Sequence, residues 1–315
     1  MPGHKWFDGW KPALEDARRV GLRTGDGRLV AAVIERASSG RARLTACASF
    51  EGDTAADSLI AWQRRGGYRK AANNLLLANG DYQILPINAP PVAPEERAGA
   101  ARWLIKGMID YPADEAAVDC LMIPSDAPSS AQRKAWAVVA RRSSVVAWAE
   151  RWHRGGLNLA CVDIPELALR NLAALTPPDG ACALLHIGPH ASTLVMVWQG
   201  ELCSTRRFEI GADQFDLADA QRLAFSVERL GLEVQRSADA FERQFHSFAL
   251  GRLWVTPTVA GVDLAAALGA QLNLRVQTFQ LEDWLDVGVD AEILAAGCGI
   301  DWWPAIGAAL RSEMS

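Results

Sequence analysis

The sequence has no paired cysteines and no excess of basic residues. Its six cysteines are scattered over 315 residues, with no Cys-x-x-Cys spacing and no histidine cluster beside them. This pattern favours small core residues in a reducing compartment over a zinc or redox site. The formal net charge is −5, whereas nucleic-acid binding usually shows as a basic excess. We therefore expect no structural metal and no nucleic-acid partner.

One stretch of the sequence is long enough for a membrane-spanning segment, but the residues at its centre do not favour one. Residues 180–200 contain no Asp, Glu, Lys or Arg and are long enough to cross a bilayer. Their centre, residues 187–192, reads Ile-Gly-Pro-His-Ala-Ser, which is turn chemistry between two segments of strand length. We expect a buried hairpin here. Residues 1–19 lack the apolar core of a secretory signal, so we expect a soluble protein without a leader.

The sequence signatures of common enzymes are missing as well. No glycine-rich run ends in Gly-Lys-Ser/Thr, and no Gly-x-Ser-x-Gly elbow is present. His186 and His190 are four residues apart, but they flank a turn and have no acidic neighbour in the sequence. We interpret them as core or turn histidines and predict no metal site.

What the sequence does contain is a normal globular composition, with 50% hydrophobic and 22% charged residues. Its length suggests two lobes. A strand–turn–strand–turn–strand pattern runs from Val20 to Phe50, and the same layout recurs from Ala183 to Ile210. Two such units indicate a duplicated architecture.

Mixed helix and strand patterns fill the rest of the chain. The residues between the two meanders alternate between strand-like runs and apolar stripes with helical spacing. A long stripe follows the second meander, and a last helical run comes near the end. We predict helices over 95–110, 143–152, 165–175, 223–245, 262–272 and 303–311.

Several ordered segments resemble proteins of the MshI/PilM family. Residues 79–85 read Asn-Gly-Asp-Tyr-Gln-Ile-Leu, and residues 102–106 read Arg-Trp-Leu-Ile-Lys. The most specific match is Asp-Ile-Pro-Glu-Leu-Ala-Leu-Arg-Asn-Leu over residues 163–172. Further matches lie at residues 233–241 and 306–311. Together the matches cover roughly residues 20 to 311, in the family's order.

The resemblance implies an α/β protein with the actin-like ATPase fold (ASKHA, ribonuclease H-like). Such a fold has two lobes, each with a meander-containing sheet, and the family inserts a small subdomain in the first lobe. We expect a first lobe over residues 1–178, an insert over about 75–137, a second lobe over 179–300, and a helix at 301–315 that returns to the first lobe.

The resemblance also places a nucleotide cleft, and the sequence departs from it there. Nucleotide-binding relatives have acidic residues where this chain has Arg23 and His186, and the glycine run near residue 261 is reduced to one glycine. Magnesium held with phosphate needs such carboxylates. We therefore expect no cofactor, with ATP as the open alternative. The expected vestigial cleft comprises Arg23, Thr24, Gly25, His186, Gly188, Glu233, Arg236 and Gly261.

The function implied is a non-catalytic cytoplasmic scaffold of MSHA-type (type IV) pilus assembly at the inner face of the inner membrane. It would bind the cytoplasmic N-terminus of a PilN-like membrane protein. The pilus motor ATPase would be a further partner. We expect the peptide to lie against the helix of residues 95–111 and the neighbouring strand of residues 81–88, where edge pairing can hold an extended chain. The surface residues expected to contact it are Tyr82, Arg102, Ile105, Lys106 and Tyr111. Two alternatives stay open: a nucleotide-binding switch or ATPase of the same fold, and the cytoplasmic part of a GspL-like type II secretion protein.

Overall fold

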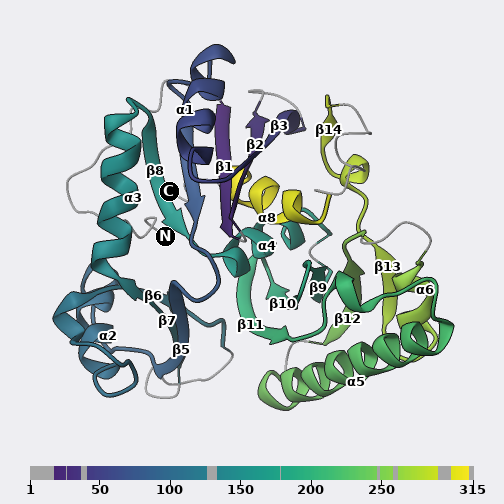
Figure 1. Cartoon of the computed structure of the whole chain (residues 1–315). Helices are drawn as coiled ribbons and strands as arrows, with labels where there is room; N and C mark the ends of the chain where they lie inside the picture. The colour runs from purple at the N-terminus through teal and green to yellow at the C-terminus, as the bar shows by residue number, and fades with distance from the viewer. Residues whose placement is uncertain are drawn as a thin grey trace.

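Two sheets of the same topology form the body of the protein. The computed structural model describes residues 18–25, 27–36, 41–125, 133–177, 179–246, 249–257, 262–289 and 299–311. The first sheet has the order β14-β3-β2-β1-β4-β8 (Figure 1). Its strands are β1 (Arg18–Gly25), β2 (Arg28–Glu35), β3 (Arg43–Glu51), β4 (Ala72–Leu76), β8 (Asn158–Asp163) and β14 (Asp286–Val287).

The second sheet repeats the arrangement of the first. Its order is β11-β10-β9-β12-β13, so an antiparallel meander is again extended by two parallel strands beside its first strand. The strands are β9 (Ala181–Ile187), β10 (Ser192–Trp198), β11 (Glu201–Phe208), β12 (Leu250–Val255) and β13 (Arg275–Thr278). The duplicated meander predicted from the sequence is therefore confirmed. The uncharged stretch over residues 180–200 is the β9–β10 hairpin, as expected.

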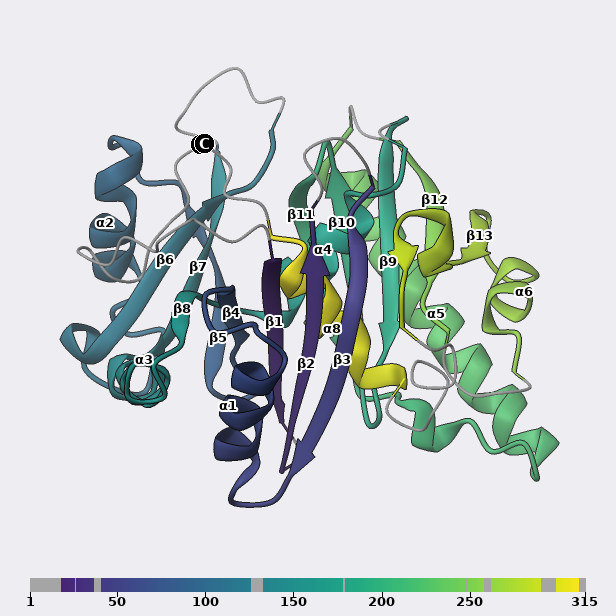
Figure 2. The ribbon, with the colours of Figure 1, turned by 90° about the horizontal axis from the view of Figure 1, so that it is seen from above.

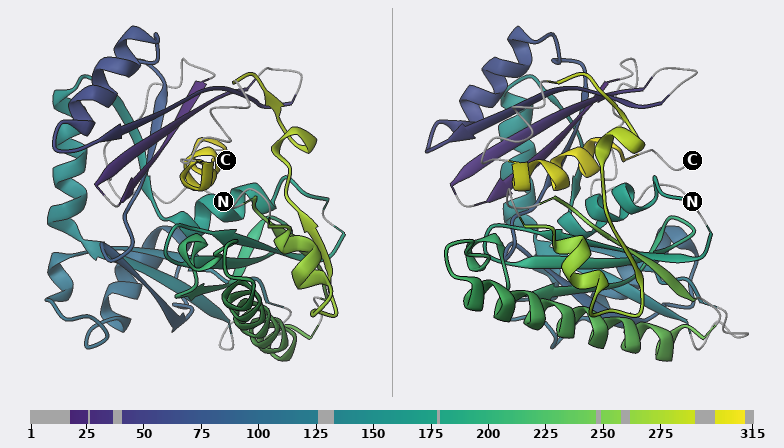
Figure 3. Two further views of the ribbon diagram at one scale, coloured as in Figure 1. Left: turned by 45° about the vertical axis from the view of Figure 1, so that its right-hand side comes forward. Right: turned by 90° about the vertical axis from the view of Figure 1, so that its right-hand side faces the viewer.

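Two helices lie between the sheets, and the others cover the outer faces. Figure 3 shows α8 end-on in the middle of the molecule, with α4 beside it. One apolar core joins these two helices to the inner faces of both sheets, and separate cores lie under the outer helices. The central helices are α4 (Pro165–Ala173) and α8 (Gly299–Ala309), and the outer ones are α1 (Ala55–Arg65), α3 (Arg142–Arg154), α5 (Ala220–Gln244) and α6 (Leu264–Gly269).

A small subdomain interrupts the first lobe between β4 and β8. Its sheet has the order β5-β7-β6, and α2 packs on one face of it at the end of the molecule opposite α5 and α6 (Figure 2). Its elements are β5 (Tyr82–Asn88), α2 (Arg97–Leu104), β6 (Ala116–Met122) and β7 (Lys134–Arg141). The last strand extends a little beyond the predicted end of the insert at residue 137. Short 3-10 turns are η1 (Pro94–Glu96), η2 (Ala113–Glu115), η4 (Ala212–Gln214) and η5 (Leu281–Asp283).

The predicted helices are corrected in three places. The helix expected over 95–110 ends at Leu104, because Gly107 turns the chain with a φ of 89°. Helix α1 had no counterpart in the prediction. The last helix is described from Gly299, four residues before the expected start, so Pro304 lies inside the helix and not at its first turn. Among the described residues, no helix combines the length and the apolar character that a membrane crossing needs.

Candidate functional site

The centre of the predicted cleft contains an ion pair between the first strand and the last helix. Arg23 lies near the end of β1, and its Nη1 atom is 2.8 Å from Oδ1 of Asp301 in the first turn of α8. Both side chains are largely buried, with 13% and 10% of their surface exposed. Arg28, at the start of β2, lies 3.5 Å from the other carboxylate oxygen. The arginine at the family's acidic position is therefore neutralised from within the protein.

Close backbone packing brings Asp301 to this position. A Cβ atom on Gly21 of β1 would lie 1.9 Å from the carbonyl oxygen of Ala305, and one on Gly307 would lie 2.1 Å from that of Ala168. These distances are too short for any side chain, so α8 can approach both β1 and α4 only because both glycines lack one. The first turn of α8 then reaches the end of β1.

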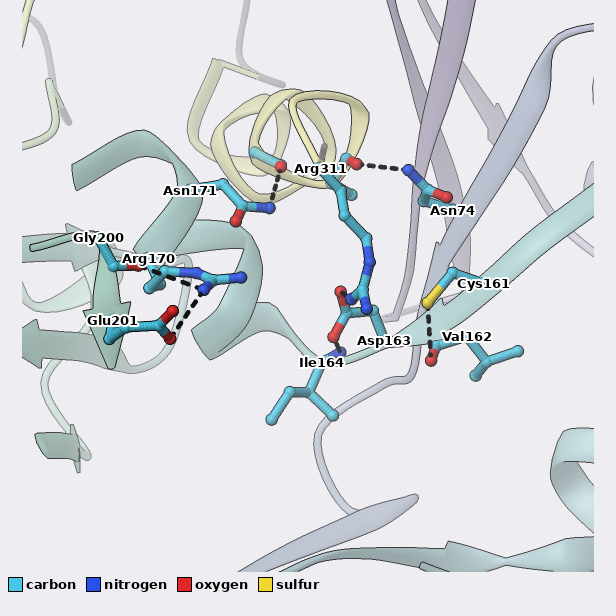
Figure 4. A network of polar contacts seen from close by, with 12 residues as sticks. Asn74, Cys161, Val162, Asp163, Ile164, Arg170, Asn171, Gly200, Glu201 and Arg311 are labelled. Atoms are coloured by element: carbon cyan, nitrogen blue, oxygen red, sulfur yellow. Dashed lines mark hydrogen bonds and ion pairs between the residues drawn. The ribbon is translucent and has the colours of Figure 1, made fainter. Parts of the chain in front are cut away.

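The C-terminal end of α8 is fixed by side chains from three other elements (Figure 4). Asn74 donates to the carbonyl of Ala308 at 2.8 Å, and Asn171 donates to that of Gly307 at 2.9 Å. Helix ends leave such carbonyls without partners, so these amides satisfy them. Arg311 forms an ion pair with the buried carboxylate of Asp163, which raises the pKa of its guanidinium. The two family-like motifs at residues 163–172 and 306–311 thus contact each other.

His186 occupies the second expected acidic position and is buried. Its Nδ1 atom lies 3.2 Å from Oγ1 of Thr256, which follows β12. Burial, and to a lesser extent the nearby charge of Arg23, lowers the pKa of His186 to about 3. The imidazole is therefore neutral at physiological pH.

The two turns of the cleft offer few groups to a phosphate. The Thr24 hydroxyl donates to the carbonyl of Leu76 at 3.1 Å, and Gly25 has a φ of 152° beside the Arg23 guanidinium. In the other turn, the Gly188 N–H donates to the carbonyl of Ala191 at 2.9 Å. The next residue, Pro189, has no N–H at all. Phosphate-binding loops depend on free backbone N–H groups. In the second turn the Gly188 N–H is already bonded and Pro189 has none.

The remaining cleft residues lie elsewhere or outside the described residues. Glu233 and Arg236 form an ion pair of 2.9 Å on the surface of α5. This helix packs on the outer face of the second sheet, whereas α4 packs on its inner face. Gly261 lies outside the described residues.

A magnesium–nucleotide group does not fit the residues at this site. The carboxylate that the fold brings here belongs to Asp301, and two guanidiniums already face it. His186 carries no negative charge to replace the second acid. A divalent cation would therefore meet arginine side chains where it needs carboxylates. Among the described residues there is also no group of three or more His, Cys, Asp or Glu residues arranged to hold a metal ion. Sequence analysis missed Asp301, because no local signal marks it.

The five residues predicted to bind a peptide do not share one surface. Ile105 is fully buried in the subdomain core, which corrects our expectation that it is a contact residue. Tyr82 is largely buried and donates a hydrogen bond of 2.7 Å to the carboxylate of Glu166 in α4. Lys106 is exposed and Arg102 is half-buried near the end of α2. Tyr111 stacks under Arg141, with 4.1 Å between the guanidinium carbon and the ring centre.

Tyr82 and Glu166 connect the subdomain to the first lobe. Burial raises the pKa of the Tyr82 hydroxyl, and the neighbouring Glu166 carboxylate raises it further. Burial likewise raises the pKa of Glu166. The charge of Arg207, in β11 of the second sheet, acts on both groups. The Tyr82–Glu166 hydrogen bond thus joins the subdomain to α4, within reach of the charge of Arg207.

Strand β5 leaves one edge of the subdomain sheet open. Within the described residues it pairs with β7 and with no other strand. The N–H of Ala89 donates back toward the β7 side, to the carbonyl of Arg133. Because successive residues of a strand point their backbone groups to opposite sides, those of Tyr82, Ile84 and Pro86 point away from β7. A proline is tolerated at such an outward position.

Comparison with solved structures identifies the fold. A chain of the "PilM-PilN type IV pilus biogenesis complex" matches 93% of this chain and 98% of its own length, with a TM-score of 0.69 and 20% sequence identity. This protein therefore has the actin-like fold. This confirms the fold class predicted from the sequence.

Two actin-like matches are looser. The cytoplasmic domain of EpsL from Vibrio cholerae, an inner membrane component of the type II secretion system, has a TM-score of 0.47 and 12% identity over 81% of this chain and 94% of its own. A protein of actin-like ATPase fold and unknown function from Bacteroides thetaiotaomicron has a TM-score of 0.49 and 10% identity over 88% and 95%. Neither carries a functional argument. Protein-family models and curated proteins give no match.

Proposed function

We propose that this protein is a non-catalytic cytoplasmic scaffold of type IV pilus assembly, of the MSHA type, at the inner face of the inner membrane. Its partner would be the cytoplasmic N-terminus of a PilN-like membrane protein, and the pilus motor ATPase would be a second contact. The fold shared with a chain of the PilM–PilN complex supports the assignment to this machinery. The resemblance of residues 163–172 to the MshI/PilM family supports it independently.

The observation that carries the non-catalytic part is the Arg23–Asp301 ion pair. It places a cation in the cleft at the position where relatives have an acid, and it uses the nearest carboxylate to neutralise that cation. The pair also fixes α8 to β1. We infer that the cleft has become part of the core that joins the two lobes, so that the protein presents a fixed surface instead of a nucleotide-driven switch.

For the partner peptide we propose the open edge of β5. An extended peptide can add to an exposed sheet edge through main-chain hydrogen bonds, with side-chain pockets providing specificity. Ile84 offers an outward N–H and carbonyl there, whereas Pro86 offers a carbonyl alone. At one end of this edge Tyr82 donates to the carboxylate of Glu166, and the positive charge of Arg207 acts on both groups. This placement keeps the strand of the predicted surface and omits Ile105, which is buried.

A matched pair of backbone variants tests the placement. Ile84→Pro removes an outward N–H without removing a hydrogen bond to β7, and Pro86→Val adds an outward N–H. The binding of a fluorescent peptide with the cytoplasmic N-terminus of a PilN-like protein from the same organism is measured by anisotropy. We expect Ile84→Pro to weaken binding about fivefold, the equivalent of one net hydrogen bond, and Pro86→Val to leave it equal or stronger.

The outcomes separate the scaffold proposal from the placement of the peptide. If the wild-type protein does not bind the peptide, the proposed partner is wrong. If a folded Ile84→Pro variant binds as tightly as the wild type, the peptide binds elsewhere. Circular dichroism and the thermal unfolding midpoint establish that each variant is folded.

A further inference from the structure

A cleft of about 600 Å³ lies between α1 and α3, on the outer side of the first sheet. This volume falls within the range of small-molecule sites. Figure 1 shows the two helices on the same side of that sheet, away from α8. The cleft is therefore separate from the predicted nucleotide cleft and from the β5 edge. Its lining residues are Asp57, Ile60, Ala61, Arg64, Ala147, Arg151, Arg154 and Gly155.

The cleft is positively charged, although the chain as a whole has a net charge of −5. Three arginines and one aspartate line it. In the part of the chain that the structure describes, neither Arg151 nor Arg154 pairs with a carboxylate. A fourth cation is close, because the position of a Cβ atom on Gly156 is 3.6 Å from Nη2 of Arg69 and 4.0 Å from Nη2 of Arg64.

Regular helix geometry explains why these arginines converge. Ala147, Arg151 and Arg154 follow each other by four and three residues, so they share one face of α3. Arg64 approaches from α1, where it donates a hydrogen bond of 2.7 Å to the carbonyl of Gly155. A Cβ atom on Gly155 would lie 2.8 Å from Cδ1 of Ile60, so this glycine allows the end of α3 to approach α1.

Converging cations repel each other, and an anion between them removes that repulsion. Guanidinium groups are planar forks that match the oxygens of a phosphate with two parallel hydrogen bonds. Beside the arginines, Ile60, Ala61 and Ala147 form an apolar wall that can cover the non-polar part of a ligand. The cleft thus combines the two kinds of contact that a phosphate ester needs.

We propose that this cleft binds a phosphate-bearing ligand, with Arg64, Arg151 and Arg154 on the phosphate and Ile60 beside the remainder. A soluble phosphate ester and the headgroup of an anionic lipid share this chemistry. The proposal does not depend on the proposed pilus function, because none of these residues belongs to the β5 edge.

The test uses pyrophosphate as a soluble probe, measured by calorimetry, and vesicles of phosphatidylcholine and phosphatidylglycerol in equal parts, measured by co-sedimentation. The Arg151→Ala/Arg154→Ala variant removes two cations from the cleft. Its control, Arg222→Ala/Arg243→Ala, removes two exposed cations from α5 and changes the net charge equally. A second variant, Ala147→Glu, adds a carboxylate to the cleft at an exposed position and keeps every arginine.

We expect Arg151→Ala/Arg154→Ala to weaken binding about tenfold or more per arginine lost, as for hydrogen bonds to charged groups. Ala147→Glu should weaken it as well, because its carboxylate repels the anion, while the control binds as the wild type does. Sensitivity of pyrophosphate binding alone assigns a soluble ligand, and sensitivity of vesicle binding assigns a lipid headgroup. The proposal is overturned if the wild type binds neither probe, or if the cleft variants and the control bind equally well.

Discussion

The guanidinium of Arg23 and the carboxylate of Asp301 lie 2.8 Å apart and join the first strand of the structure to the first turn of its last helix. Arg28 contacts the same carboxylate from β2. One carboxylate thus contacts two arginines at the centre of the molecule, and Arg28 has a second carboxylate partner in Glu51.

Asp301→Asn should destabilise the fold by about 3 kcal/mol, because the largely buried Arg23 guanidinium loses the carboxylate that faces it at 2.8 Å. Urea denaturation at neutral pH measures the free energy of unfolding. Glu51→Gln is the matched control: Glu51 also pairs with Arg28, but its side chain is 67% exposed. An exposed pair contributes little, so we expect a change below about 1 kcal/mol. Equal losses in the two variants would contradict the role of Asp301.

Gly21→Ala should destabilise the protein by about 3 kcal/mol, since the added methyl group would collide with the backbone of α8. Gly99→Ala provides the comparison. Gly99 lies in α2 with no atom within 4 Å of its Cβ position, so alanine there should stabilise by up to about 1 kcal/mol through helix propensity. Thermal unfolding of both variants measures the difference, and a neutral Gly21→Ala would mean that α8 does not contact β1 as described.

The stability of the protein should decrease as the pH falls below 6.5, in part because of His186. Its pKa is lowered from 6.5 to about 3, so the unfolded chain takes up a proton in this interval while the folded chain does not. Above pH 6.5 this group leaves the free energy of unfolding unchanged. Below pH 6.5 it lowers the free energy of unfolding by about 1.4 kcal/mol per pH unit toward pH 3.

His186→Gln should make the pH dependence shallower by that amount, because a glutamine does not titrate. The measurement is denaturation at a series of pH values between 7 and 4. His246→Gln, in the exposed turn after α5, should leave the slope unchanged. An unchanged slope in His186→Gln would show that His186 is not buried in its neutral form.

Tyr82→Phe should cost about 2 kcal/mol, because the buried Glu166 carboxylate loses the hydroxyl that donates to it at 2.7 Å. Tyr68→Phe removes a hydroxyl for which no side-chain hydrogen bond is described, and it should change stability far less. Denaturation measures both variants. If the two have equal effects, the Tyr82–Glu166 contact does not hold the subdomain against α4.

Much of the fold follows from local patterns in the sequence. Alternating apolar residues over residues 44–50 predict β3, and the three- and four-residue steps from Leu223 to Phe245 predict α5. The end of α2 is also a local event, and Gly107 could have shown it. The domain boundaries predicted from the resemblance stay predictions, although α8 does pack on the first sheet.

The site could be predicted only in part, because its contacts are long-range. The resemblance placed Arg23 and His186 in one cleft, and the charge of Arg23 contributes to lowering the pKa of His186. Asp301 has no local signal, since its position depends on the close packing of Gly21 and Gly307 against other backbones. Ile105 has the spacing of a helix residue, which does not tell whether it faces the core or a partner. The arginines of α1 and α3 come together only because both helices pack on the same face of the first sheet.

Calorimetric titration of the protein with ATP in the presence of Mg²⁺ tests the central claim most directly. Because the cleft between α1 and α3 is itself proposed to bind phosphate, the titration uses the Arg151→Ala/Arg154→Ala variant. The account predicts no saturable heat in this variant even at millimolar ATP, because Arg23, Asp301 and His186 leave no site for the cation. Saturable binding in the micromolar range that disappears in Arg23→Ala would contradict it and would make the protein a nucleotide-dependent member of the actin-like fold.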